Sequence, residues 1–132
     1  MATTTNPKNS VLFVDDCHYV LEAIRRIVSF VLPHWRAEFV SCGDAALQRL
    51  EQCRFDVLVT DMPGVTGAQL VHRAKAAWPH MACLLFTGDN SVRALVPEAT
   101  GVIPKPCSLD LLRRTLDAAV GKHTAEPQGA MP

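Results

Sequence analysis

Five short apolar segments alternate along the chain with longer segments of helical periodicity. The apolar segments are residues 10–14, 37–41, 55–59, 81–86 and 101–104, and their β-branched and aromatic residues favour strands. Between them, apolar residues recur in steps of three and four, as in amphipathic helices. Strands that alternate with helices predict an α/β fold, in which a parallel sheet is covered by helices on both faces.

The expected helices are residues 19–32, 43–53, 67–77, 91–96 and 109–120. The first stops at Pro33, and the last is capped by Ser108 and ends at Gly121. The residues expected to face inward are Val20, Ile24, Ile27, Val28, Val31, Ala46, Leu47, Leu50, Leu70, Val71, Ala74, Leu109, Leu112, Leu116 and Ala119.

This pattern predicts a single domain at residues 10–121, with a five-stranded, doubly wound (βα)5 parallel sheet. Residues 1–9 are expected to form a flexible lead, and residues 122–132 a disordered tail.

Composition narrows the class of protein. The chain has 132 residues, 48% of them hydrophobic, and its 13 basic residues balance 13 acidic ones, which argues against sequence-independent nucleic-acid binding. No apolar run approaches the roughly 20 residues that span a bilayer, and the polar start lacks the apolar segment of a secretory signal. We therefore expect a cytoplasmic protein that binds neither nucleic acid nor membrane.

The cysteines predict no disulfide framework and no structural zinc site. There are five, at positions 17, 42, 53, 83 and 107, and none has C-x-x-C spacing. Cys53 and Cys83 adjoin apolar stretches and are expected in or near the core. A redox or soft-metal role for Cys17 with Cys107 is a less favoured alternative.

Polar, chemically active residues stand where the expected strands end. Asp15 and Asp16 follow the first strand, Asp61 the third, Thr87 ends the fourth, and Lys105 follows the fifth. A single acid there could merely cap a turn, but the carboxyl ends of parallel strands share one edge of the sheet. Converging carboxylates repel one another, and a hard cation such as Mg²⁺ relieves that repulsion. Lys105 and Thr87 would then bind phosphoryl oxygens.

These residues resemble the receiver domains of bacterial response regulators in two-component signalling, including stand-alone, chemotaxis-regulator-like ones. The resemblance lies in the acids of "LFVDD", Asp61 in "FDVLVTDMPGVTG", Thr87 in "LLFTGD" and Lys105 in "VIPKP", and it covers residues 10 to about 120. It implies the flavodoxin-like receiver fold. It also implies a phosphoprotein that is not a true enzyme, and that only phosphorylates and dephosphorylates itself with Mg²⁺.

The resemblance also implies residue roles. Asp61 would accept a phosphoryl group from a sensor histidine kinase or phosphotransfer protein. Mg²⁺ would be held by Asp15, Asp16, Asp61 and the backbone carbonyl of Pro63, and of the two adjacent acids Asp16 is favoured as the direct ligand. Lys105 would contact the acyl phosphate and Thr87 would act as the switch hydroxyl. A conformational change would then signal to a downstream protein.

Three departures from the family pattern stand out. Pro63 and Gly67 each lie two residues closer to Asp61 than the family usually places them. Val102 occupies the position of the usual switch aromatic, and the 18 residues from Thr87 to Lys105 are about one helical turn short. These departures support an alternative, which is a degenerate receiver that acts as a phosphorylation-independent interaction module.

Two enzyme or binding classes rank lower. A phosphatase with an Asp nucleophile usually has a second acid two residues later, where Pro63 stands here. A nucleotide-binding fold would have a Gly-rich loop after the first strand, and none is present.

Overall fold

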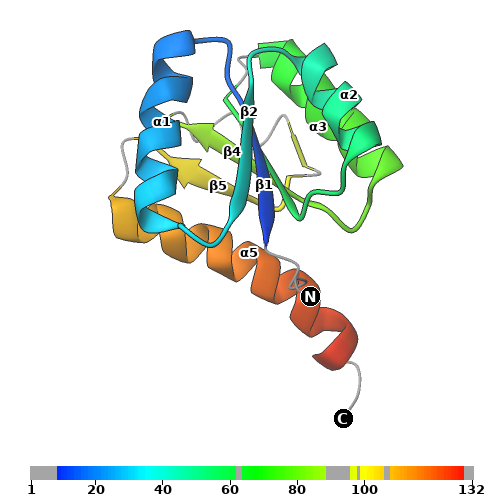
Figure 1. The fold of residues 1–132 in the computed structure, drawn as a ribbon. Coiled ribbons are helices and arrows are strands. Elements are labelled where there is room, and N and C mark those ends of the chain that lie inside the picture. The colour runs from blue at the N-terminus through cyan, green and yellow to red at the C-terminus, as the bar shows by residue number, and fades with distance from the viewer. Residues whose placement is uncertain (1–8, 62–63, 89–95, 98, 106–107, 130–132) are drawn as a thin grey trace.

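The computed structural model describes residues 9–61, 64–88, 96, 97, 99–105 and 108–129. Five strands form one parallel sheet in the order β2-β1-β3-β4-β5 (Figure 1). They are β1 (Ser10–Val14), β2 (Arg36–Val40), β3 (Val57–Thr60), β4 (Ala82–Thr87) and β5 (Gly101–Pro104). This is the flavodoxin-like strand order, so the expected fold class is confirmed.

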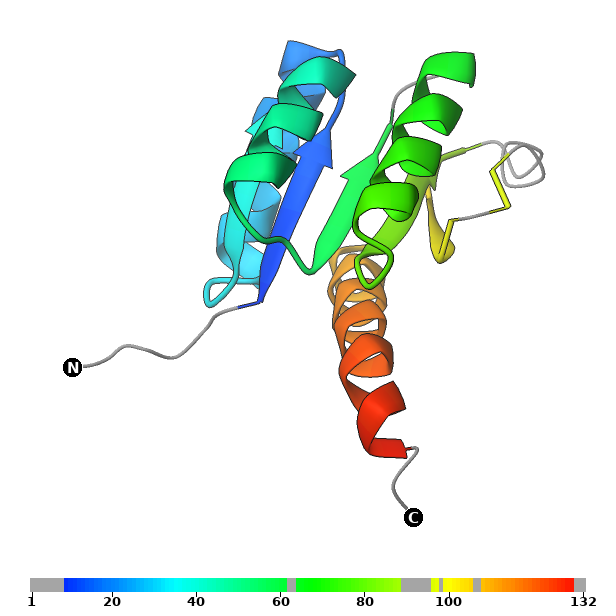
Figure 2. The same ribbon diagram turned by 90° about the vertical axis from the view of Figure 1, so that its right-hand side faces the viewer.

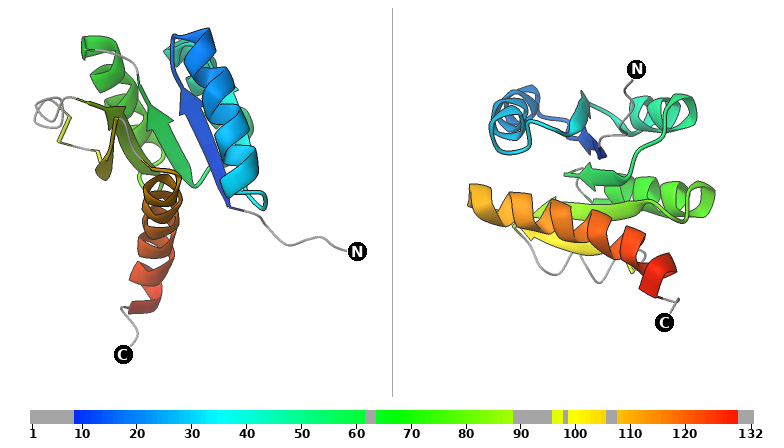
Figure 3. Two further views of the ribbon diagram at one scale, coloured as in Figure 1. Left: turned by 90° about the vertical axis from the view of Figure 1, so that its left-hand side faces the viewer. Right: turned by 60° about the horizontal axis from the view of Figure 1, so that its bottom comes forward.

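Helices cover both faces of the sheet (Figure 2 and Figure 3). In the described part of the chain they are α1 (His18–Val31), α2 (Gly43–Gln52), α3 (Gly64–Ala77) and α5 (Leu109–Gly129). Helices α1 and α5 pack on one face, and α2 and α3 pack on the other. The short helix expected at 91–96 falls almost wholly outside the described residues.

The alternation of side chains along β1 builds both halves of the core. Val11 and Phe13 face α1 and α5, whereas Leu12 and Val14 face α2 and α3, and all four are at most 1% exposed. A strand buried on both faces needs a continuous apolar run, which is what residues 11–14 supply. β1 is therefore an interior strand that contributes to the core on both faces of the sheet.

Most of the expected inward-facing residues are buried or half-buried. Leu109 is the exception, because 45% of it is exposed. It lies in the first turn of α5, and the packing of α5 against the core begins only at Leu112. The expected cap is confirmed, since the N–H of Leu111 donates to the Ser108 hydroxyl at 3.0 Å.

Two helix limits differ from the expectation by more than one residue, and both involve glycine. α3 begins at Gly64 rather than Gly67, and α5 continues past Gly121 to Gly129. A glycine inside a helix costs only about 1 kcal/mol relative to alanine, so it need not mark an end. The helical backbone of α5 thus enters the segment expected to be a disordered tail, while the domain boundaries remain predictions.

The described cysteines are all free thiols. Cys83 is buried, and burial raises the pKa of its thiol to about 12. Cys53 packs against the core cluster on the α2–α3 face. Cys107 lies outside the described residues, so the alternative that pairs it with Cys17 stays a prediction.

None of the described helices combines the length and the apolar character needed to cross a membrane.

Candidate functional site

Strand register brings two of the expected acids together. Val14 of β1 pairs with Thr60 of β3, so Asp15 and Asp61 follow side by side. The N–H of Asp61 donates to the Val14 carbonyl at 2.8 Å, which extends the ladder one residue beyond the strand. The two carboxyl groups therefore share the carboxyl edge of the sheet, as the sequence predicts.

Asp15 is a buried acid with an incompletely satisfied carboxyl group. It is 3% exposed, and its Oδ1 accepts a hydrogen bond from the Cys17 N–H at 2.8 Å. Its Oδ2 has no hydrogen-bond partner in the part of the chain that is described. Burial first, and the adjacent Asp61 second, raise the pKa of Asp15 to about 6.

Asp61 is paired with a cation. The Lys105 ammonium bonds Asp61 Oδ2, and both side chains are partly buried. The Lys105 N–H donates to the Thr87 carbonyl at 3.1 Å, which fixes the end of β5 against the end of β4. A Cβ on Gly88 would lie 3.2 Å from the Lys105 carbonyl, so the absence of a side chain allows this close approach.

The remaining candidates differ in exposure. Asp16 is exposed, and Thr87 is half-buried at the end of β4. Pro63 lies outside the described residues. The structure thus brings Asp15, Asp61 and Lys105 together. The metal-ligand roles expected for Asp15, Asp16, Asp61 and Pro63 all stay predictions.

The donor set fits a hard divalent cation. Within the described residues, no group of three or more His, Cys, Asp or Glu side chains lies close enough to hold a metal. Mg²⁺ needs only one or two carboxylates, because it keeps several waters. The buried Asp15 oxygen that lacks a hydrogen-bond partner lies beside Asp61, and a bound Mg²⁺ would supply the partner that it lacks.

Sequence reasoning missed a residue at this site, Phe86. The Lys105 ammonium lies 5.0 Å from the centre of the Phe86 ring. The sequence assigned Phe86 only to a strand. Its position directly before Thr87 at a strand end was the available signal.

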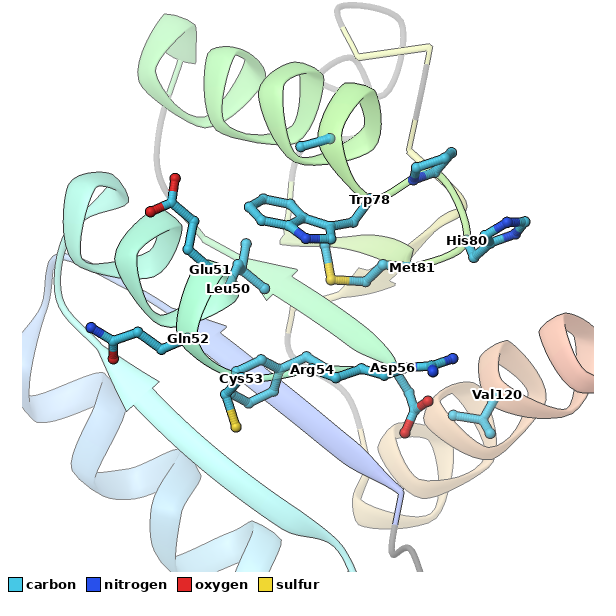
Figure 4. A pocket seen from close by; sticks show the side chains of 13 residues that line it. Leu50, Glu51, Gln52, Cys53, Arg54, Asp56, Trp78, His80, Met81 and Val120 are labelled. Atoms are coloured by element: carbon cyan, nitrogen blue, oxygen red, sulfur yellow. The ribbon is translucent and has the colours of Figure 1, made fainter.

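A hollow of about 790 Å³ lies at the opposite edge of the sheet (Figure 4). It is lined by the ends of α2 and α3, by the residues that precede β3 and β4, and by Val120 of α5. Trp78, Met81 and Cys53 are among its lining residues. None of the strand-end candidates lines it, so it is separate from the carboxylate site.

Comparisons with known proteins agree with this geometry. The model of the response regulator receiver domain family matches residues 11–117. A virulence sensor protein, BvgS of Bordetella pertussis, is 31% identical over an alignment that covers 99% of the chain. The chain spans 12% of the length of that sensor.

Solved structures show the same fold. The signal receiver domain of an HD domain-containing protein from Pseudomonas fluorescens has a TM-score of 0.80 at 21% identity, covering 96% of this chain and 97% of that one. The response regulator TrrA from Thermotoga maritima, solved in complex with Mg²⁺–BeF, has a TM-score of 0.75 at 18% identity, covering 84% and 98%. From the match over most of its length, we conclude that the chain belongs to the response regulator receiver domain family of two-component signalling.

Proposed function

We propose that this receiver domain accepts a phosphoryl group on Asp61, with Mg²⁺, and signals by a conformational change. The observation that carries the proposal is the Lys105 ammonium bonded to Asp61 beside the buried Asp15. In this arrangement Asp61 would act as the nucleophile beside the positive charge that Lys105 provides. The donor would be the phosphohistidine of a sensor histidine kinase or phosphotransfer protein.

The transfer is a displacement at phosphorus. An Asp61 carboxylate oxygen forms the new P–O bond while the P–N bond to the donor imidazole breaks, and the leaving nitrogen takes up a proton. A carboxylate is a weak nucleophile, so acceleration comes from position and from neutralised charge. The Lys105 ammonium would contact the phosphoryl oxygens during the transfer and balance the charge that develops on them.

Mg²⁺ would be held by Asp15, Asp16, Asp61 and the backbone carbonyl of Pro63. When bound, it supplies neutralising charge at the transferring group. The buried, unmatched oxygen of Asp15 supports this assignment, as does the Mg²⁺–BeF complex of the T. maritima relative. Asp15 and Asp61 themselves contribute the oxygen ligands that a hard cation prefers.

Phosphorylation adds about 1.5 to 2 negative charges at the edge of the sheet. Thr87, at the end of β4, would turn its hydroxyl toward the new oxygens and so report the modification. The recipient of the signal would be a downstream protein in the cytoplasm, and this chain itself would bind neither nucleic acid nor membrane. The chain would not act as a true enzyme, because the only group it modifies is its own Asp61.

A degenerate receiver that binds partners without phosphorylation is the second candidate. The observation that favours it is that, among the described residues, the expected acidic ligands form no group close enough to hold a metal. Val102 at the switch-aromatic position and the short loop after Asp61 point the same way.

The test is intact mass after incubation with acetyl phosphate or phosphoramidate, with Mg²⁺ or with EDTA. The proteins compared are wild type, the variant Asp61→Asn and a matched control variant, Asp44→Asn, in the first turn of α2. We expect one phosphoryl adduct in wild type and Asp44→Asn, and none in Asp61→Asn or in EDTA. If wild type binds no Mg²⁺ and gains no mass, the interaction module replaces the proposal. If Asp61→Asn still gains mass, Asp61 is not the acceptor.

A further inference from the structure

Phe86 lies on the same face of the sheet as Asp61 and Lys105 of the candidate site. Phe86 of β4 is in register with Ile103 of β5, and both belong to the core beneath α1 and α5. Lys105 follows Ile103 by two residues, so it leaves the backbone on that same face. Asp61 follows the buried Val59 by two residues and shares this face as well.

The ring and the carboxylate together confine the Lys105 ammonium. Its Nζ lies 5.0 Å from the centre of the Phe86 ring, and it also bonds Asp61 Oδ2. A cation within about 6 Å of an aromatic ring centre is attracted by the ring quadrupole. The lysine side chain is long and flexible, so a second contact restricts where its charge can be.

Phe86 is itself held by packing. It is half-buried and packs against the core cluster that contains Leu112 and Leu116 of α5. A ring anchored in the core is a fixed platform, in contrast to a surface aromatic that is free to move. The ammonium therefore rests on a part of the protein that has little freedom.

We propose that Phe86 is a positioning residue, which holds the Lys105 ammonium over its ring and so presents it to the group transferred to Asp61. The proposal rests on the proposed function, because its kinetic consequence requires phosphorylation of Asp61. The role needs the aromatic ring, and apolar volume alone does not supply it.

The decisive variant is Phe86→Leu, which keeps an apolar side chain and removes the ring. We expect phosphorylation of Asp61 by phosphoramidate and Mg²⁺ to slow by about three- to tenfold, as expected for the loss of one cation–π contact. Phe86→Tyr restores a ring and should recover most of the rate.

Phe39→Leu is the matched control. The Phe39 ring packs against the same core cluster and also carries a cation, since the Arg25 guanidinium lies 4.6 Å from its centre. Phe39→Leu therefore removes an equivalent ring and an equivalent cation–π contact without touching Lys105. It should lower the thermal unfolding midpoint and leave the rate of phosphorylation unchanged.

A spectroscopic measurement reads the contact independently of any phosphorylation. The chain has four lysines, so the ε-methylene signals of ¹³C-lysine-labelled protein can be assigned with Lys105→Arg. The ring current of Phe86 should shift the Lys105 signal upfield in wild type and in Phe86→Tyr. In Phe86→Leu the signal should return to the position of an exposed lysine.

The rates and the Lys105 signal can each overturn the proposal. A Phe86→Leu rate equal to wild type would overturn the proposal, and so would a Phe86→Tyr rate as slow as that of Phe86→Leu, because packing would then explain the loss. An unshifted Lys105 signal in wild type would also overturn it. If wild type gains no phosphoryl group but shows the shifted signal, the proposed function fails while the Phe86 contact is upheld.

Discussion

The two ends of β3 each carry an aspartate, and the two are held in opposite ways. Asp56, just before the strand, accepts hydrogen bonds at its Oδ2 from the N–H of Ser10 at 2.9 Å and from the Ser10 hydroxyl at 3.2 Å. Asp61, just after the strand, is bonded by the ammonium of Lys105 and lies beside the buried carboxyl group of Asp15.

The comparison separates a carboxylate that ties two strands together from the one that we propose as the phosphoryl acceptor. Neutral donors of Ser10 on β1 bond one oxygen of Asp56, and these bonds tie the start of β3 to the start of β1. At the other end, two carboxyl groups share one edge and one of their buried oxygens has no partner among the described residues. Such crowding is unfavourable without added positive charge, which supports the proposal that this end binds a cation and a phosphoryl group.

The largest expected difference between the two ends is in phosphorylation. Asp61→Asn should abolish the phosphoryl adduct, because an amide is not a nucleophile here, whereas Asp56→Asn should keep a rate close to wild type. Intact mass after phosphoramidate treatment measures both. An adduct lost equally in the two variants, with both still folded by circular dichroism, would break the comparison.

The second expected effect compares two lysines that lie at opposite edges of the sheet, Lys105 beside Asp61 and Lys75 near the start of β4. Lys105→Met should slow phosphorylation by about 100-fold, as is typical when one preorganised charge is removed from a reacting centre. Lys75→Met is the control, because Lys75 donates to the carbonyls of Pro79 and Met81 at the other edge. It should cost stability but not rate. Equal rates for the two variants would mean that Lys105 is not at the reacting centre.

The third prediction concerns the burial of Asp15. Because its pKa rises from 3.8 to about 6 on folding, the folded state binds a proton more tightly than the unfolded state. The stability that this proton contributes is fully present below about pH 4 and is lost as the pH rises through 6. At pH 7 in EDTA, Asp15→Asn should therefore be more stable than wild type, by up to about 3 kcal/mol.

Urea unfolding of wild type and Asp15→Asn from pH 4 to pH 7.5 measures this difference. The gain should shrink toward pH 4, where both side chains are neutral, and should also shrink on addition of Mg²⁺. If Asp15→Asn and wild type have the same free energy of unfolding at every pH, the burial of Asp15 carries no penalty.

The smallest expected effect is at Asp56. Ser10→Ala removes the hydroxyl donor and leaves the N–H bond of residue 10 in place, so it should lower the free energy of unfolding by about 1 kcal/mol. Phosphorylation should be unaffected. A loss of phosphorylation at unchanged stability would connect the two edges and would remove the distinction between them.

Much of the fold could be predicted because apolar patterning is a local signal. The continuous apolar runs at residues 11–14 and 57–59 indicate strands buried on both faces, and the structure confirms them. Helix limits were less well predicted, since Gly67 and Gly121 lie inside helices whose packing outweighs the cost of glycine.

The candidate site divides in the same way. By itself, the sequence determined that carboxylates, a hydroxyl and a lysine stand at strand ends, because parallel strands bring their carboxyl ends to one edge. Only the tertiary structure decided that Asp15 is buried while Asp16 is exposed, and that Phe86 lies beneath Lys105. Burial and ring contacts depend on residues that are distant in the chain, and those distances close only when the strands pair and α5 packs on the sheet.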